Sequence, residues 1–281
     1  MLPACSPGRE TTVRPLALHQ ITAMEASPPD LLSIAAEVGC ANACVFVHLP
    51  TPNVPFPAVT RAMLGEMRAR MADTGVGVSN IEYFPLMADT DVADFRAALD
   101  LGAELSAHRL VTHIHDPDDM RAAARLAALA DLAAERGLDV GLEFMGLTPA
   151  CNSIARAVRF VELAARPNVG IAVDCLHVVR TGGTAEQLAA VPAELFSYGQ
   201  LCDGPDMSVQ ADYLPEAMDR MVPGDGVFPI RALVEATPAA VPFDVEVPSL
   251  TGQQAGVPAL ERARKAAEAG RRILDAARPT R

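Results

Sequence analysis

Short apolar runs alternate with helical segments along this chain of 281 residues, and this alternation constrains the fold more than any other feature. Eight runs have the length and composition of buried strands: residues 16–21, 43–48, 76–84, 109–115, 138–145, 169–174, 195–201 and 241–247. Helices are predicted between Ser27 and Gly39, between Asp116 and Gly137, and over 57–72, 91–101, 153–165, 185–191, 228–236 and 260–277. Eight such units without a domain-sized break predict an α/β fold, a (β/α)8 TIM barrel.

The rival architecture is a doubly wound open sheet. It is disfavoured because no G-x-G-x-x-G follows the first predicted strand and no Walker loop is present. The barrel is predicted as one domain over residues 15–281, preceded by an N-terminal tail of residues 1–14 that lacks the pattern of a signal peptide.

Composition narrows the class of function. The net charge of −12 argues against nucleic acid as a partner, and no apolar stretch is long enough to cross a membrane. Lys265 is the single lysine and lies in a late amphipathic segment, which excludes Schiff-base chemistry. The six cysteines form no C-x-x-C pair and are expected to be reduced thiols in a cytoplasmic protein. A small-molecule substrate is expected, and a homo-oligomer is left open.

Polar residues follow the late strands where each apolar run ends. The segment from Asn168 to His177 reads N-V-G-I-A-V-D-C-L-H and presents Asp174 and His177 at its end. An unpaired carboxylate in a buried strand is destabilising, so Asp174 and His177 indicate a functional site. Glu143, Gln200 and Glu246 occupy equivalent positions on three other late strands.

These side chains are expected to converge, because the active sites of such barrels lie at the C-terminal ends of the strands. Three carboxylates in one cavity would repel one another unless a cation lay among them. Oxygen ligands favour Mg²⁺ or Mn²⁺, with Co²⁺ and Zn²⁺ as alternatives. The opposing interpretation is that one or two of these residues face the helices or the barrel base.

The order of these motifs resembles the sugar-phosphate isomerase/epimerase family of xylose-isomerase-like barrels. The resemblance covers nearly the whole chain and rests on Glu143, the D-x-x-H of Asp174 and His177, the R-x-x-P-G-x-G run from Arg220, and Glu246. Relatives include tagatose and psicose epimerases, hydroxypyruvate isomerase, inosose dehydratase and 3-dehydroshikimate dehydratase.

The resemblance implies a role for each matching residue. Glu143, Asp174, Gln200 and Glu246 correspond to the four metal ligands, and Glu143 and Glu246 would also remove and return the proton. His177 corresponds to a histidine that contacts substrate oxygens. Arg220 corresponds to an arginine above the metal.

The function implied is a metal-dependent isomerase or epimerase of a small hydroxy-ketone or sugar-like substrate, acting through an enediolate. Gln200 departs from the epimerases, which carry histidine there, and is similar to the dehydroshikimate dehydratases. A metal-dependent dehydratase is therefore one alternative, and a metal-free barrel with a binding role is another. Xylose isomerase itself is disfavoured, because it uses a second metal, a lysine and tryptophan walls, and this chain has no tryptophan.

Other polar residues lie at the ends of the first four predicted strands. His48, Glu82 and His113 are predicted to bind substrate, and His19 and His115 could also line the pocket. The connection from residue 202 to 228 is long enough to suggest a lid that carries Arg220 to the substrate. The alternative is a surface arginine paired with Asp219 or Asp225.

Overall fold

A closed barrel of eight parallel strands forms the centre of the computed structural model, which describes residues 14–49, 54 and 56–277. The strands are β1 (Leu16–His19), β2 (Asn42–Phe46), β3 (Gly77–Leu86), β4 (Arg109–Ile114), β5 (Asp139–Glu143), β6 (Val169–Asp174), β7 (Phe196–Leu201) and β8 (Phe243–Val245). Each strand pairs with the next, and β8 pairs with β1. The predicted (β/α)8 barrel is confirmed. Residues 1–13 of the predicted tail lie outside the described residues.

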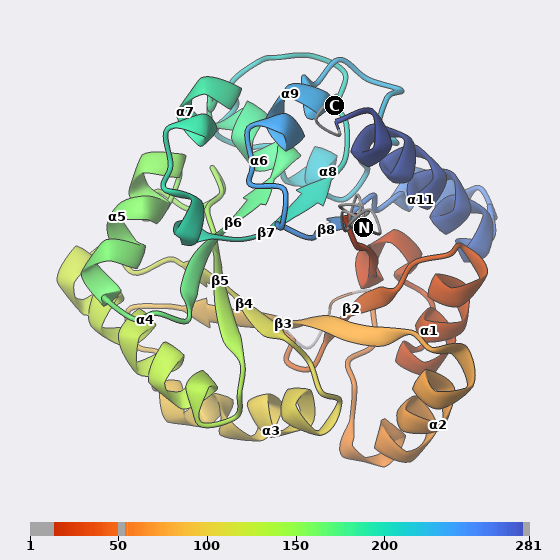
Figure 1. Ribbon diagram of the computed structural model, residues 1–281, viewed down its shortest axis with the longest axis horizontal. Coiled ribbons are helices and arrows are strands. Elements are labelled where there is room, and N and C mark those ends of the chain that lie inside the picture. Colours follow the sequence, from red (N-terminus) through yellow and green to blue (C-terminus); the bar gives the residue numbers. More distant parts are fainter. Residues whose placement is uncertain (1–13, 50–53, 55, 278–281) are drawn as a thin grey trace, which may run out of the picture.

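Helices form a ring around the strands (Figure 1). The α-helices are α1 (Pro28–Glu37), α2 (Leu64–Thr74), α3 (Arg96–Glu104), α4 (Asp119–Ala134), α5 (Ile154–Ala164), α6 (Cys175–Arg180), α7 (Ala185–Ala189), α8 (Leu214–Ala217), α9 (Ile230–Glu235), α10 (Leu250–Gln254) and α11 (Ala259–Ala276). Short 3₁₀ turns cover Gln20–Ala23, Arg61–Met63, Val92–Phe95 and Ala193–Leu195. In the described part of the chain, every helix is too short or too polar to cross a bilayer.

Two predicted elements have clearly different bounds in the structure, and helix α6 is an element that the sequence did not predict. The first strand ends at His19, because the His19 side chain accepts a hydrogen bond from the Ile21 backbone and begins a 3₁₀ turn. The helix predicted over 57–72 begins only at residue 61, because Val59 donates its backbone hydrogen bond to Phe46 of β2 and keeps this segment extended. Helix α6 was not predicted, and it begins directly after Asp174.

Side chains alternate strictly along the strands, and this alternation creates two environments. On β6, Val169, Ile171 and Val173 join the main apolar core. Ala172 instead packs with Val111 and Tyr198 in a separate small cluster inside the barrel. The barrel interior is therefore narrow and partly polar, which leaves room for cavities at both ends of the strands.

Candidate active site

The four predicted metal ligands meet at the C-terminal ends of four consecutive strands. Glu143 ends β5, Asp174 ends β6, Gln200 lies on β7 and Glu246 follows β8. All four are buried, with at most 5% of their surface exposed. Asp174 and Gln200 lie at the same level of the barrel, because they are register partners across the β6–β7 ladder.

Arg220 joins two of these residues. Its Nη1 donates to Asp174 Oδ2 at 2.6 Å, and its Nη2 donates to Glu246 Oε1 at 2.8 Å. Gln200 Nε2 also donates to Glu246. Burial disfavours the charge of Arg220, but the two carboxylates outweigh this effect and raise its pKa well above the ordinary value. The guanidinium therefore supplies the positive charge that the sequence required among these carboxylates.

Asp174 also builds the local backbone. Its Oδ1 accepts hydrogen bonds from the backbone N–H groups of Leu176 and His177 at 2.6 and 3.4 Å, and so caps helix α6. The D-x-x-H spacing thus has a structural cause. The first turn of α6 brings His177 beside Glu143, with His177 Nε2 at 3.3 Å from Glu143 Oε1.

Glu143 is the centre of a histidine-rich cluster. His113 Nε2 lies 2.8 Å from Glu143 Oε2, on the side opposite His177. Burial would raise the pKa of Glu143, but the charges and hydrogen bonds of the two histidines outweigh it and hold the pKa below the ordinary value. Tyr213, which the sequence analysis missed, orients His177 because its hydroxyl lies 2.8 Å from His177 Nδ1.

The pKa of Glu246 is shifted in the opposite direction. Burial raises the pKa of Glu246 to about 7, although the positive charges of Arg220 and His19 oppose this shift. Environments that separate the pKa values of two carboxylates are typical of sites that transfer protons.

A second buried cluster lies on the first three strands. His19 Nε2 is 2.9 Å from Glu82 Oε1, and the Cys44 thiol donates to the same oxygen at 3.1 Å. Sequence analysis missed Cys44 because a single cysteine carries no spacing signal. His19, Glu82, His113 and His115 all line one cavity of about 320 Å³, together with Glu143, His177, Arg220 and Glu246. The structure therefore brings the early and late strand-end residues to one mouth.

The substrate-binding role expected of His48 stays a prediction, although His48 does not line this cavity. His48 is half-buried outside the cavity, where its ring stacks with Phe84, and its Nδ1 lies 2.8 Å from the Tyr83 carbonyl oxygen. The chain has already left β2 at this point, so its side chain does not face the lumen. The alternative of a surface Arg220 paired with Asp219 or Asp225 is wrong, since Arg220 is buried and pairs with Asp174 and Glu246.

The connection after β7 is anchored at several points. The Asp203 carboxylate accepts hydrogen bonds from the backbone N–H groups of Gly204, Gly224 and Phe228. The fully buried Arg180 side chain holds Glu216 of α8 through two short hydrogen bonds. This anchoring fixes the segment that presents Arg220 to the mouth.

The donor set fits a divalent cation. Two of the predicted ligands, Glu143 and Asp174, form with His177 a group whose ligand atoms lie within 4.8 Å of one another; Glu246 is not part of this group and is linked to Asp174 through Arg220. Gln200 Oε1 is buried and has no hydrogen-bond partner among the described residues. A buried acceptor without a donor is costly, and a cation would satisfy it. Carboxylate, amide and imidazole ligands suit hard or borderline divalent metals.

The His19–Glu82 pair predicts a pH dependence of stability. Burial lowers the pKa of His19, but Glu82 and Glu246 outweigh it and raise the pKa to about 10. A histidine with a raised pKa stabilises the fold fully below its unfolded value near 6.5 and loses this contribution as the pH rises toward 10. We therefore expect the stability lost on Glu82→Gln to be largest near pH 6.5 and to shrink toward pH 10. Urea unfolding at both pH values measures it, with exposed Glu66→Gln as the control; a loss independent of pH would contradict the pairing.

The fold and site define a class: a parallel eight-stranded barrel with acidic and histidine side chains at its C-terminal mouth. The chain belongs to the Xylose isomerase-like TIM barrel family, whose sequence profile matches residues 32–274. The resemblance found in the sequence is thereby confirmed.

Individual relatives match shorter segments. The chain is 30% identical over 126 residues to 3-dehydroshikimate dehydratase from Pseudomonas aeruginosa, which covers 43% of this chain and 20% of that protein. It is 31% identical over 103 residues to inosose isomerase from Halalkalibacterium halodurans, covering 36% of this chain and 35% of that protein. The chain thus spans a minor part of the length of these relatives.

Solved structures show the same fold at low identity. The IolI protein with a bound zinc atom has a TM-score of 0.79 at 17% identity, and the match covers 95% of this chain and 100% of that chain. L-ribulose 3-epimerase has a TM-score of 0.71 at 18% identity, with 95% and 96% covered. The relatives of this chain thus include a dehydratase and an isomerase, and an epimerase shares its fold.

Proposed function

We propose that this chain is a divalent-metal-dependent isomerase or epimerase of a small hydroxy-ketone or sugar-like substrate. The observation that carries the proposal is a buried set at one mouth: Glu143 lies beside Asp174, Arg220 joins Asp174 to Glu246, and Gln200 contacts Glu246. Gln200 Oε1 has no hydrogen-bond partner among the described residues. A structural neighbour of the same fold holds a zinc atom, and the donor set of this chain is compatible with Mn²⁺, Mg²⁺, Co²⁺ or Zn²⁺.

Glu143, Asp174, Gln200 and Glu246 would hold the ion. When bound, a divalent ion polarises a substrate carbonyl and stabilises the negative charge that develops when the neighbouring carbon loses its proton. The remaining chemistry belongs to the side chains of this chain, which bind the substrate and move its proton.

Proton transfer is assigned to the two glutamates. Glu143 comes from β5 and Glu246 follows β8, with β6 and β7 between them, so their carboxylates reach the mouth from different parts of the barrel wall. One carboxylate removes the proton beside the carbonyl, and a protonated carboxyl returns a proton to the same or the adjacent carbon. His177, held by Tyr213, donates to a substrate oxygen.

A dehydratase is the second candidate, and Gln200 favours it. The resemblance places glutamine here in dehydroshikimate dehydratases, and one such enzyme is among the relatives. The reaction begins with the same proton removal. The electron pair left by the removed proton then forms a carbon–carbon double bond with the next carbon, the carbon–oxygen bond on that carbon breaks, and its electron pair leaves with the hydroxide, which His177 protonates to give water.

One experiment separates these possibilities. The Mn²⁺-loaded protein is incubated in D₂O with an inosose, a ketohexose and 3-dehydroshikimate, and the products are followed by NMR. An isomerase or epimerase incorporates deuterium beside the carbonyl and keeps all substrate oxygens, whereas a dehydratase yields an alkene and water. No exchange on any substrate, together with no stoichiometric metal binding, would contradict both enzyme proposals and favour a metal-free barrel with a binding role.

A further inference from the structure

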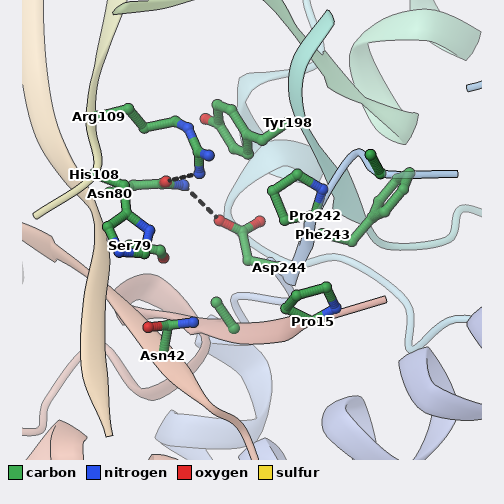
Figure 2. Close-up of a pocket in the computed structure, with 12 residues that line it drawn as sticks. Pro15, Asn42, Ser79, Asn80, His108, Arg109, Tyr198, Pro242, Phe243 and Asp244 are labelled. Carbon is green, nitrogen blue, oxygen red and sulfur yellow. Dashed lines mark hydrogen bonds between the residues drawn. The ribbon is translucent and has the colours of Figure 1, made fainter. Parts of the chain in front are cut away.

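A second cavity lies at the opposite, N-terminal end of the barrel (Figure 2). Its volume is about 270 Å³, and none of its described lining residues lines the cavity at the C-terminal mouth. Its polar wall comes from the beginnings of β3, β4 and β8 and from β7. Pro15, His108 and Ala240 are exposed at its rim, so the cavity opens to solvent.

A chain of hydrogen-bonded polar side chains spans this cavity. Arg109 Nη1 donates to Asn80 Oδ1 at 2.8 Å, and Asn80 Nδ2 donates to Asp244 Oδ2 at 3.1 Å. The Arg109 guanidinium also lies over the Tyr198 ring, 5.4 Å from its centre. Figure 2 shows this chain from Arg109 through Asn80 to Asp244.

Three polar atoms around this cavity have no hydrogen-bond partner among the described residues. Asp244 Oδ1, the Tyr198 hydroxyl and Arg109 Nε are buried and make no hydrogen bond within the described part of the chain. Asp244 and Tyr198 are each only 1% exposed. Buried polar atoms without partners are rare and costly, so three of them around one cavity indicate that a ligand completes the network.

We propose that this cavity is a second ligand site and that it binds a small neutral polyol of the size of a monosaccharide or a cyclitol. The atoms without a hydrogen-bond partner are a carboxyl oxygen, a guanidinium N–H and a phenol hydroxyl, so the ligand must both donate and accept hydrogen bonds. Neighbouring hydroxyl groups do this. Pro15, Pro242 and Phe243 form an apolar wall that suits the C–H face of such a molecule.

Charge and size support the same class. An anion would meet the Asp244 carboxyl, and a cation would meet the Arg109 guanidinium. Burial and nearby glutamates raise the pKa of Asp244, but a hydroxyl can pair with either the protonated or the ionised carboxyl. The cavity volume falls below the roughly 300–1,000 Å³ typical of drug-sized ligands, which favours a compact molecule. The site does not depend on the reaction proposed at the other mouth.

Tyrosine NMR tests this site directly, because the chain has three tyrosines. Tyr198 lines the N-terminal cavity, whereas Tyr83 lines the C-terminal cavity and Tyr213 contacts His177. In protein labelled with ring-¹³C tyrosine, Tyr83→Phe and Tyr213→Phe variants assign the signals. The probes are myo-inositol, xylitol and, as an anion, acetate.

We expect myo-inositol or xylitol to shift the Tyr198 signal in a saturable way. Arg109→Gln should weaken this response at least tenfold, whereas Arg136→Gln, which alters an arginine in the turn after α4 that pairs with Asp100, should leave it unchanged. Asp244→Asn serves as the second variant if Arg109→Gln does not fold. A Tyr198 signal that ignores both polyols, responds to acetate alone, or responds equally in the Arg109 and Asp244 variants would overturn the proposal.

Discussion

Replacing Arg220 by alanine is expected to lower the free energy of unfolding of the metal-free protein by about 3–5 kcal/mol. Arg220 is the partner of both Asp174 and Glu246, and all three are buried. Its removal leaves two buried carboxylates without this counter-charge. Breaking a buried ion pair from one side costs this much because the remaining charges stay desolvated.

Binding of a divalent metal should restore much of the free energy of unfolding that Arg220→Ala loses. A divalent ion held by the same carboxylates restores positive charge, so Mn²⁺ should stabilise Arg220→Ala more than it stabilises the wild type. Chemical unfolding with and without Mn²⁺ measures both effects. Exposed Arg231, which pairs with Glu235 on α9, provides the control; Arg231→Ala should cost less than about 1 kcal/mol. A loss of similar size in both variants would show that Arg220 does not hold the site together.

Replacing Glu143 by glutamine is expected to lower kcat by about 10²–10⁴ on the substrate that the D₂O experiment identifies. Glutamine keeps the size of the side chain and can still accept a hydrogen bond from His113, but it cannot remove a proton. The histidines that flank Glu143 hold its pKa low, so the wild-type carboxylate is ionised at neutral pH.

Metal content separates the two roles of Glu143. Elemental analysis of the variant shows whether the ion is still present, and kcat is compared at full occupancy. Glu162→Gln, on the exposed face of α5, is the matched control and should keep wild-type kcat. An occupied Glu143→Gln variant with wild-type kcat would remove Glu143 from the proton transfer.

Periodicity explains why much of the barrel could be predicted. Buried parallel strands read as continuous apolar runs, and β6 matches its predicted bounds of 169–174. The period of two also places Gln200 and Glu246 on the inner face, because each follows an inward residue, Tyr198 or Asp244, by two positions. The period therefore explains why Gln200 and Glu246 lie on the inner face near the C-terminal ends of their strands, whereas their role as metal ligands stays a prediction.

Features that depend on contacts between distant segments could not be predicted in this way. The pairing of Arg220 with Asp174 and Glu246 depends on how the connection after β7 is anchored by Asp203 and Arg180. Helix α6 was missed because Asp174 was interpreted as a strand-end ligand alone, although aspartate is also a strong helix cap.

Binding of Mn²⁺ to the EDTA-treated protein tests the central claim most directly. Calorimetric titration of wild type, Asp174→Asn and Asp118→Asn compares three proteins that can all cap their helices, because asparagine replaces aspartate well at this position. Asp118 caps α4 on the surface and is the control. The metal-site account predicts one ion per chain in the wild type and in Asp118→Asn, with affinity reduced at least tenfold in Asp174→Asn. Absence of binding in the wild type, or equal affinity in all three proteins, would contradict it.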